Sequence, residues 1–126
     1  MTLRRRKPTD AELGILQVLW ARGPSTVRAV AEAMGRQDAY TTVLKLLQIM
    51  TKKRLVRRRE SGRLHVYAAA YSEDQTQQQF VRDLLQRVFD GSAARLVLQA
   101  LATGKASPED LTEIQRLLDA RRRGGQ

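Results

Sequence analysis

The amino-acid sequence contains no cysteine and no asparagine among its 126 residues, and its single histidine is His65. The lack of cysteine excludes a disulfide framework, a thiolate metal site and a cysteine nucleophile, and one histidine cannot form a multi-histidine metal cluster. Stretches without a charged residue reach only nine residues, as in 13–21, whereas a membrane-spanning helix needs about 20. We therefore expect a protein with no cofactor, no metal and no membrane insertion.

The N-terminal segment also lacks the apolar region of a secretory signal. A basic run, residues 4–7, could begin such a signal, but Pro8, Thr9, Asp10 and Glu12 stand where the apolar region would have to be. We therefore expect the protein to be cytoplasmic.

The charge of the chain is strongly positive and unevenly distributed. Lys and Arg number 23 against 13 Asp and Glu, which gives a formal net charge of +10. Residues 1–71 hold 15 basic and 5 acidic residues, whereas residues 72–126 hold 8 of each. A basic segment beside a neutral one indicates a polyanionic partner, with nucleic acid as the first candidate. A solvated basic face without a partner and an anionic membrane surface are the alternatives.

The first 71 residues predict three helices and a β-hairpin. Thr9 and Glu12 have the spacing of a capping box, and Gly23-Pro24 separates the first helix from the second. The expected helices cover about residues 10–21, 27–34 and 40–53. A change to strand composition then predicts a hairpin of residues 55–59 and 63–69 around a turn at Glu60-Ser61-Gly62. This order is that of a winged helix-turn-helix, in which the third helix enters the major groove of DNA.

Residues 72–126 predict three amphipathic helices. Their apolar positions follow helical spacing, and they are Phe80, Leu84, Val88, Leu96, Val97, Leu101, Leu111, Ile114 and Leu118. Since apolar faces on a segment of little net charge need a partner to cover them, we expect a second copy of the chain to do so. The sequence thus predicts a mainly α protein with two domains, a DNA-binding domain at 1–71 and a helical dimerisation domain at 72–126.

Two groups of residues are candidates for DNA contact. In the third helix, the exposed face carries polar side chains suited to base edges and phosphates, and they are Tyr40, Thr41, Thr42, Lys45 and Gln48. In the hairpin, four residues are suited to phosphate contact, and they are Arg57, Arg58, Arg59 and Arg63. Arg36, in the connection before the third helix, is a further candidate for phosphate contact. Tyr40 has two interpretations, a stacking residue on DNA or a cap of the fold, and Trp20 is expected in the core.

At these positions the sequence resembles the penicillinase-repressor family, of the BlaI and MecI type, of bacterial transcriptional repressors. The matching segments run in order along nearly the whole chain, and they are Pro8–Leu13, Val18–Trp20, Gly23-Pro24, Thr26–Arg28, Tyr40–Val43, Leu46–Gln48, Lys53, Leu55-Val56, Tyr67, Val88–Ser92, Leu96-Val97 and Leu111–Leu118. The resemblance implies a repressor of resistance or stress genes that binds a palindromic operator as a homodimer. It also implies, for antibiotic-resistance members, release through a membrane-bound sensor protease that triggers cleavage in the dimerisation region.

The chain departs from the family pattern at several positions. Arg54 stands where members usually have glycine before the wing, and Ile49 where they often have arginine. Gln99-Ala100 follows Leu96–Leu98 where the resistance repressors have the cleaved Asn-Phe bond. A protease that reads Asn-Phe should therefore fail here, which leaves a sensor protease of different specificity or an effector that acts without cleavage. The thiolate copper site of one family branch is excluded, since the chain has no cysteine.

Two functions of other classes compete with a repressor. A nuclease would need clustered metal ligands or a nucleophile with its base, whereas the paired carboxylates Glu73/Asp74 and Glu109/Asp110 stand at expected helix starts, where capping explains them. We therefore expect no enzyme. A non-specific architectural or RNA-binding protein is the second alternative, and it would bind operator and bulk DNA equally.

Overall fold

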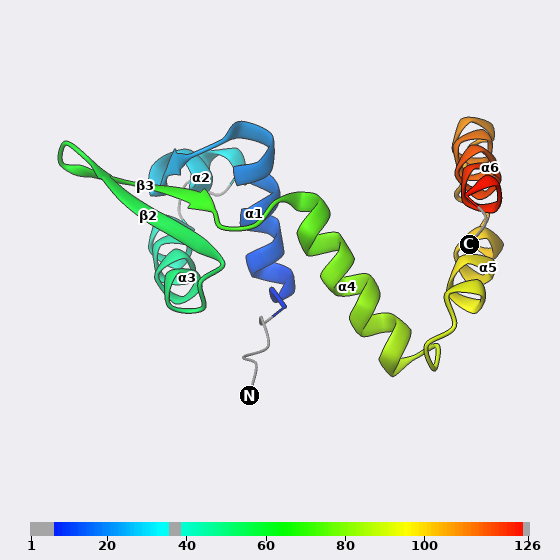
Figure 1. Ribbon diagram of the computed structural model, residues 1–126. Helices are drawn as coiled ribbons and strands as arrows, with labels where there is room; N and C mark the ends of the chain where they lie inside the picture. The colour runs from blue at the N-terminus through cyan, green and yellow to red at the C-terminus, as the bar shows by residue number, and fades with distance from the viewer. Residues whose placement is uncertain (1–6, 36–38, 125–126) are drawn as a thin grey trace. The chain divides into compact units, whose positions relative to one another are not determined.

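The computed structural model describes residues 7–35 and 39–124, which form a mainly helical chain with a small antiparallel sheet (Figure 1). The elements in chain order are α1 (Asp10–Arg22), β1 (Ser25–Thr26), α2 (Val27–Ala33), α3 (Tyr40–Lys52), β2 (Val56–Ser61), β3 (Leu64–Ala69), α4 (Glu73–Arg87), α5 (Ala93–Ala102) and α6 (Pro108–Arg123). The predicted fold class is confirmed. Within the described residues, no helix combines the length and the apolar character that a membrane span requires.

The chain divides into two compact units between Val81 and Arg82, a point inside α4. The first unit contains the three helices and the sheet expected of a winged helix-turn-helix, together with the first turns of α4. The second unit contains the rest of α4 with α5 and α6. The sequence-based boundary between residues 71 and 72 stays a prediction.

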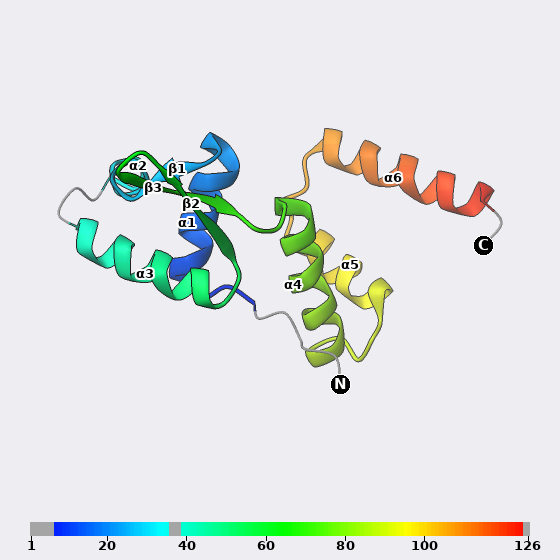
Figure 2. The same cartoon turned by 60° about the vertical axis from the view of Figure 1, so that its left-hand side comes forward.

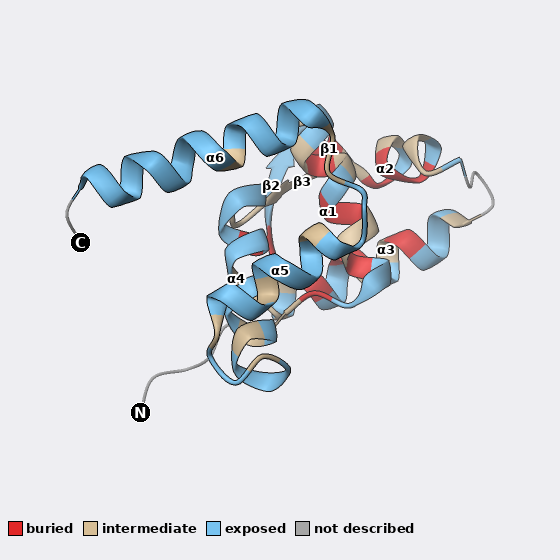
Figure 3. Cartoon of the chain, turned by 90° about the vertical axis from the view of Figure 1, so that its right-hand side faces the viewer, coloured by how far each residue is buried: buried red, intermediate tan, exposed pale blue. Residues whose placement is uncertain are grey.

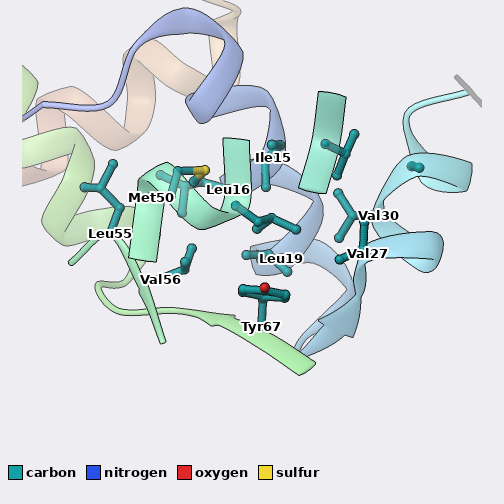
Figure 4. Packing of buried hydrophobic residues seen from close by; sticks show 12 residues of the cluster. Ile15, Leu16, Leu19, Val27, Val30, Met50, Leu55, Val56 and Tyr67 are labelled. Atoms are coloured by element: carbon teal, nitrogen blue, oxygen red, sulfur yellow. The ribbon is translucent and has the colours of Figure 1, made fainter. Parts of the chain in front are cut away.

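The first unit is built on one hydrophobic core that α1, α2, α3 and the sheet share (Figure 4). The buried members of this core are Ile15, Leu16, Leu19, Val27, Val30, Ala31, Val43, Leu47, Met50, Leu55, Val56 and Tyr67. Tyr67 points from β3 toward Leu19 of α1. Trp20 packs against the cluster, as predicted, and its Nε1–H donates to the carbonyl of Tyr71 at 3.0 Å. The end of β3 is thereby attached to α1.

Helix α1 begins with the predicted capping box. The Glu12 N–H donates to Thr9 Oγ1 at 3.2 Å, and the Thr9 N–H donates to Glu12 Oε1 at 2.9 Å. The helix ends at Gly23, whose φ of 85° lies in a region that glycine adopts without steric cost. Because both ends are fixed locally, α1 keeps one face turned to the core.

The sheet has three strands in the order β1-β3-β2, one strand more than the predicted hairpin. The extra strand, β1, has only two residues, too few to show the alternation that predicts a strand. Ser61 of β2 pairs with Leu64 of β3, so Gly62 and Arg63 form the turn. The prediction of a turn at Glu60-Ser61-Gly62 was wrong in that Glu60 and Ser61 belong to β2, and only Gly62 lies in the turn. The hairpin of β2 and β3 projects beyond the helices of the first unit (Figure 1).

Helix α3 ends in a Schellman motif. The Leu55 N–H donates to the Met50 carbonyl at 2.9 Å, and the Arg54 N–H donates to the Thr51 carbonyl at 3.1 Å. Leu55 and Met50 are both buried in the core, which supplies the apolar contact of the motif. Arg54 has a φ of 65°, a left-handed conformation that costs a non-glycine residue about 1–2 kcal/mol.

The helices α5 and α6 of the second unit consist mostly of exposed residues (Figure 3). Ser92 and Ser107 cap α5 and α6, and Ser107 forms a capping box with Asp110. Neither α5 nor α6 has a buried residue within this one chain. Val97 of α5 is 43% exposed and Leu118 of α6 is 48% exposed. Local capping therefore defines these helices, while their apolar faces are not covered by the residues that the structure describes.

Candidate nucleic-acid interface

Helix α3 presents a polar stripe on the surface of the first unit. Thr41, Lys45 and Gln48 are exposed and separated by four and three residues, so they lie on one face of the helix. Lys52 continues this spacing and is also exposed, although the sequence interpretation did not single it out. The opposite face is the buried one, formed by Val43, Leu47 and Met50. Figure 2 shows α3 along its length, below α2. We call Thr41, Lys45, Gln48 and Lys52 the α3 stripe.

Two further side chains border the α3 stripe. Thr42 is exposed, and Ile49 is 38% exposed, so an apolar group lies beside the polar ones. Their spacing of seven residues places them along the same line of the helix surface. The candidate interface thus combines hydrogen-bonding groups with one aliphatic side chain.

Tyr40, the first residue of α3, packs against α2. The Arg28 guanidinium carbon lies 5.9 Å from the centre of the Tyr40 ring, within the range of a cation–π contact. Tyr40 is still 42% exposed, so the contact with Arg28 leaves part of the ring accessible. Both interpretations of Tyr40 fit this position. Arg28 of α2 is an exposed cation beside the first residue of α3, and the sequence pattern did not single it out.

The predicted hairpin arginines are all exposed, but they do not share one surface. Residues that alternate along a strand point to opposite faces. Arg58 is the partner of the buried Tyr67, and it therefore lies on the sheet face that covers the helices. Arg57 and Arg59 lie on the other face, and Arg63 lies in the turn. The three consecutive arginines are separated by the pleat, which reduces the repulsion between them.

An acidic residue is also present in the hairpin. Glu60 is directly opposite His65 in the strand pairing, and Glu60 Oε1 lies 3.8 Å from His65 Nε2. His65 is 44% exposed, as expected for a strand residue at the surface. The positive charge of the hairpin therefore rests on its arginines.

A buried ion pair supports α3 from inside. Lys53, the C-cap of α3, donates from Nζ to Glu12 Oε2 at 2.8 Å, and Glu12 is only 2% exposed. Burial by itself raises the pKa of the Glu12 carboxyl, but hydrogen bonds from Lys53 and Thr9 and the charge of Lys53 outweigh it, so the pKa lies below its ordinary value. Lys53 therefore binds Glu12 of α1, whereas Lys52 is exposed on the α3 stripe. Sequence spacing could not reveal a pair whose partners are 41 residues apart.

We expect Glu12→Gln to destabilise the protein by about 1–3 kcal/mol at pH 7, because Lys53 loses the carboxylate that offsets its partial burial. The lowered pKa means that the carboxylate stabilises the fold at pH values above its unfolded-state pKa. This contribution disappears as the pH falls through the folded-state pKa. Urea unfolding at pH 7 and pH 3 measures both effects. The exposed Glu32→Gln serves as the control, and an equal cost of Glu12→Gln at both pH values would contradict the assignment.

The remaining predicted residues fall into three groups. Arg36 lies outside the described residues. Phe80 is half-buried in the first unit, where Lys7 Nζ lies 5.3 Å from its ring centre, and the other predicted dimerisation residues follow it in α4, α5 and α6 and in the segment after α4. Gln99 and Ala100 are exposed on α5. In the part of the chain that the structure describes, no cluster of acidic or histidine side chains is placed to hold a metal ion.

Comparison with known proteins extends these observations. A family model described as "Penicillinase repressor" matches residues 8–120, nearly the whole chain. The chain belongs to the penicillinase repressor family. This family is one of transcriptional repressors and not of enzymes, so the chain is a DNA-binding transcriptional repressor with a winged helix. The expectation that it is not an enzyme is thereby confirmed.

Two relatives and one solved structure illustrate the similarity. The transcriptional regulator BlaI of Mycobacterium tuberculosis (strain CDC 1551 / Oshkosh) is 37% identical over 92 residues, which are 71% of this chain and 67% of that protein. The penicillinase repressor of Bacillus licheniformis is 23% identical over 113 residues, which are 88% of each chain. The structure of reduced AbfR bound to DNA is 15% identical with a TM-score of 0.47, over 94% of this chain and 75% of AbfR.

Proposed function

We propose that this penicillinase repressor family member binds a palindromic operator as a homodimer, with α3 of each copy in the major groove. The α3 stripe is the observation that carries this proposal. It is polar and exposed along the helix, while the opposite face is buried, so the helix can enter the groove without loss of its core contacts. A major groove admits one α-helix of this kind.

The side chains of α3 support sequence reading. Lys45 can donate to guanine acceptors and Gln48 can form paired hydrogen bonds with adenine. Ile49, beside them, offers an apolar contact suited to a thymine methyl group. Phosphate contacts then come from the arginines of the hairpin, an element that projects beyond the helices of the first unit (Figure 1). In this arrangement α3 supplies specificity and the hairpin supplies affinity.

The second unit supports a dimer. Its helices carry apolar residues that remain exposed within residues 7–35 and 39–124, and they include Leu84, Val88, Val97, Leu98, Leu111, Leu117 and Leu118. Two copies of the unit can bury these faces against each other around a twofold axis. A twofold dimer then presents two α3 helices to half-sites that are one helical turn of DNA, about 34–36 Å, or a multiple of it apart.

Selection from a pool of random DNA duplexes tests this function. We expect the purified chain to enrich an inverted repeat, and we expect the same repeat upstream of its own gene and of neighbouring resistance or stress genes. A repressor of this kind would act in the cytoplasm. A pool that shows no enrichment after selection would instead favour a non-specific architectural protein, which binds all duplexes alike.

We propose that the repressor is released from DNA without the action of a protease that recognises an Asn-Phe bond. Gln99-Ala100 is exposed on α5, so a protease could reach it, but its side chains offer neither the amide of asparagine nor an aromatic ring. We therefore expect a membrane-bound sensor protease of different specificity, or an effector that acts without cleavage. Exposure of cells to a cell-wall antibiotic followed by mass spectrometry of the repressor decides the point. A fragment that ends at Gln99 would contradict the expectation.

A further inference from the structure

Arg54 has a backbone conformation that arginine rarely adopts. It follows the end of α3 with a φ of 65°, between two hydrogen bonds that close the helix. Glycine is the residue that this position favours, since it has no Cβ to clash with the preceding carbonyl. Residues held in such conformations persist where the surroundings enforce them and are frequent at binding sites. A role for the Arg54 side chain is therefore indicated.

Contacts inside the chain do not account for this side chain. Arg54 is exposed, and within residues 7–35 and 39–124 no ion pair involves it. The preceding Lys53 is different, because its ammonium group is bound to the buried Glu12. A positive charge near the C-terminal end of α3 favours the helix dipole, but Lys52 already supplies one there. The Arg54 guanidinium thus has five donors available for an external partner.

The length of α3 indicates what lies next to Arg54 on DNA. The helix has 13 residues, or about 20 Å, whereas the major groove is only about 12 Å wide. When Thr41 and Lys45 lie in the groove, the far end of the helix must extend over the strand that borders it. Lys52, the last residue of α3, lies seven residues beyond Lys45, about 10 Å along the helix, and Arg54 follows it by two residues. A side chain that follows the end of α3 is therefore placed toward the edge of the groove, where the phosphates of the bordering strand run.

We propose that Arg54 binds a backbone phosphate of the DNA strand bordering the groove, beside the exposed Lys52, and so fixes how far α3 slides into the groove. This inference rests on the proposed DNA-binding mode. The guanidinium fork matches the geometry of a phosphate, and it is not titrated in the physiological range. The left-handed backbone of Arg54 lowers the stability of the fold, but its guanidinium group can form a charge-assisted hydrogen bond with DNA that a glycine could not form.

The variants Arg54→Gly and Arg54→Lys test this assignment in the full-length chain. Arg54→Gly is expected to raise the melting temperature by about 3–6 °C, because the left-handed conformation no longer costs energy. It should also lower the affinity about five- to tenfold, on operator and on random duplex alike. The slope of log affinity against log salt concentration should become shallower by about 0.9, the value for one phosphate contact. Arg54→Lys should retain most of the affinity, the salt slope and the wild-type melting temperature.

A matched control is available in the second unit. Asp90 also has a positive φ, 51°, and Asp90→Gly relieves a similar conformation far from α3 in the sequence. It should raise the melting temperature without a change in DNA affinity. An Arg54→Gly variant with unchanged affinity and unchanged salt slope would overturn the proposal. Because affinity for random duplex is measured as well, the effect of Arg54 can be determined even if the wild-type chain shows no preference for the operator. A lack of operator preference would contradict the proposed function and not the role of Arg54.

Discussion

Replacement of Leu118 by Asp is expected to convert the proposed dimer into monomers and to lower the affinity for a full palindromic site by about 100-fold or more. Leu118 is 48% exposed in the single chain, so the substitution leaves the fold of one copy intact but places a charge in the proposed dimer interface. A monomer binds only one half-site. It therefore lacks the higher affinity that results when two linked DNA-binding units bind two half-sites together. The same result is expected for Val97→Asp in α5.

Sedimentation equilibrium and fluorescence anisotropy with a labelled duplex measure this effect. Ala120→Asp is the matched control, since Ala120 is an exposed residue of α6 away from its apolar face. This control should remain dimeric and bind the operator as the wild-type chain does. Dimers of Leu118→Asp that bind the palindrome with unchanged affinity would show that α6 is not part of the interface.

Lys45→Ala and Gln48→Ala are expected to weaken binding to the operator by about 1–3 kcal/mol, or about 5- to 150-fold, with little effect on random DNA. Both side chains belong to the exposed α3 stripe, where contacts to base edges discriminate between sequences. Arg58→Ala in the hairpin provides the contrast. It should weaken binding to operator and random DNA alike and reduce the salt slope by about one. Equal losses on the two duplexes for Lys45→Ala would reject the assignment of α3 to sequence reading.

The helices could be predicted because their signals are local. The Thr9 and Glu12 capping box and the Ser107 and Asp110 capping box each lie within four residues, and both are present in the structure. The periodic apolar positions of α3 likewise predict Val43, Leu46, Leu47 and Met50 as its inner face; Val43, Leu47 and Met50 are buried, and Leu46 is half-buried against the core. Thr41, Lys45 and Gln48 could be selected for DNA contact by the same spacing, since they occupy the opposite face.

The remaining features depend on contacts between distant residues, and the sequence pattern did not reveal them. The buried pair of Glu12 and Lys53 joins the start of α1 to the end of α3 across 41 residues. The division of the hairpin arginines between two faces depends on the register of Arg58 opposite Tyr67. The left-handed conformation of Arg54 is a property of the backbone, and the sequence indicates only that Arg54 stands where family members usually have glycine.

The proposed function requires that two copies of this chain bind one palindromic site through α3. Titration of three labelled duplexes at one salt concentration tests it most directly, with the full inverted repeat, one half-site and a scrambled sequence as the three sites. We predict two chains per full site, an affinity at least about 1,000-fold higher for the full site than for the scrambled duplex, and an intermediate affinity for the half-site. Equal affinity for the three duplexes, or one chain per full site, would contradict this claim.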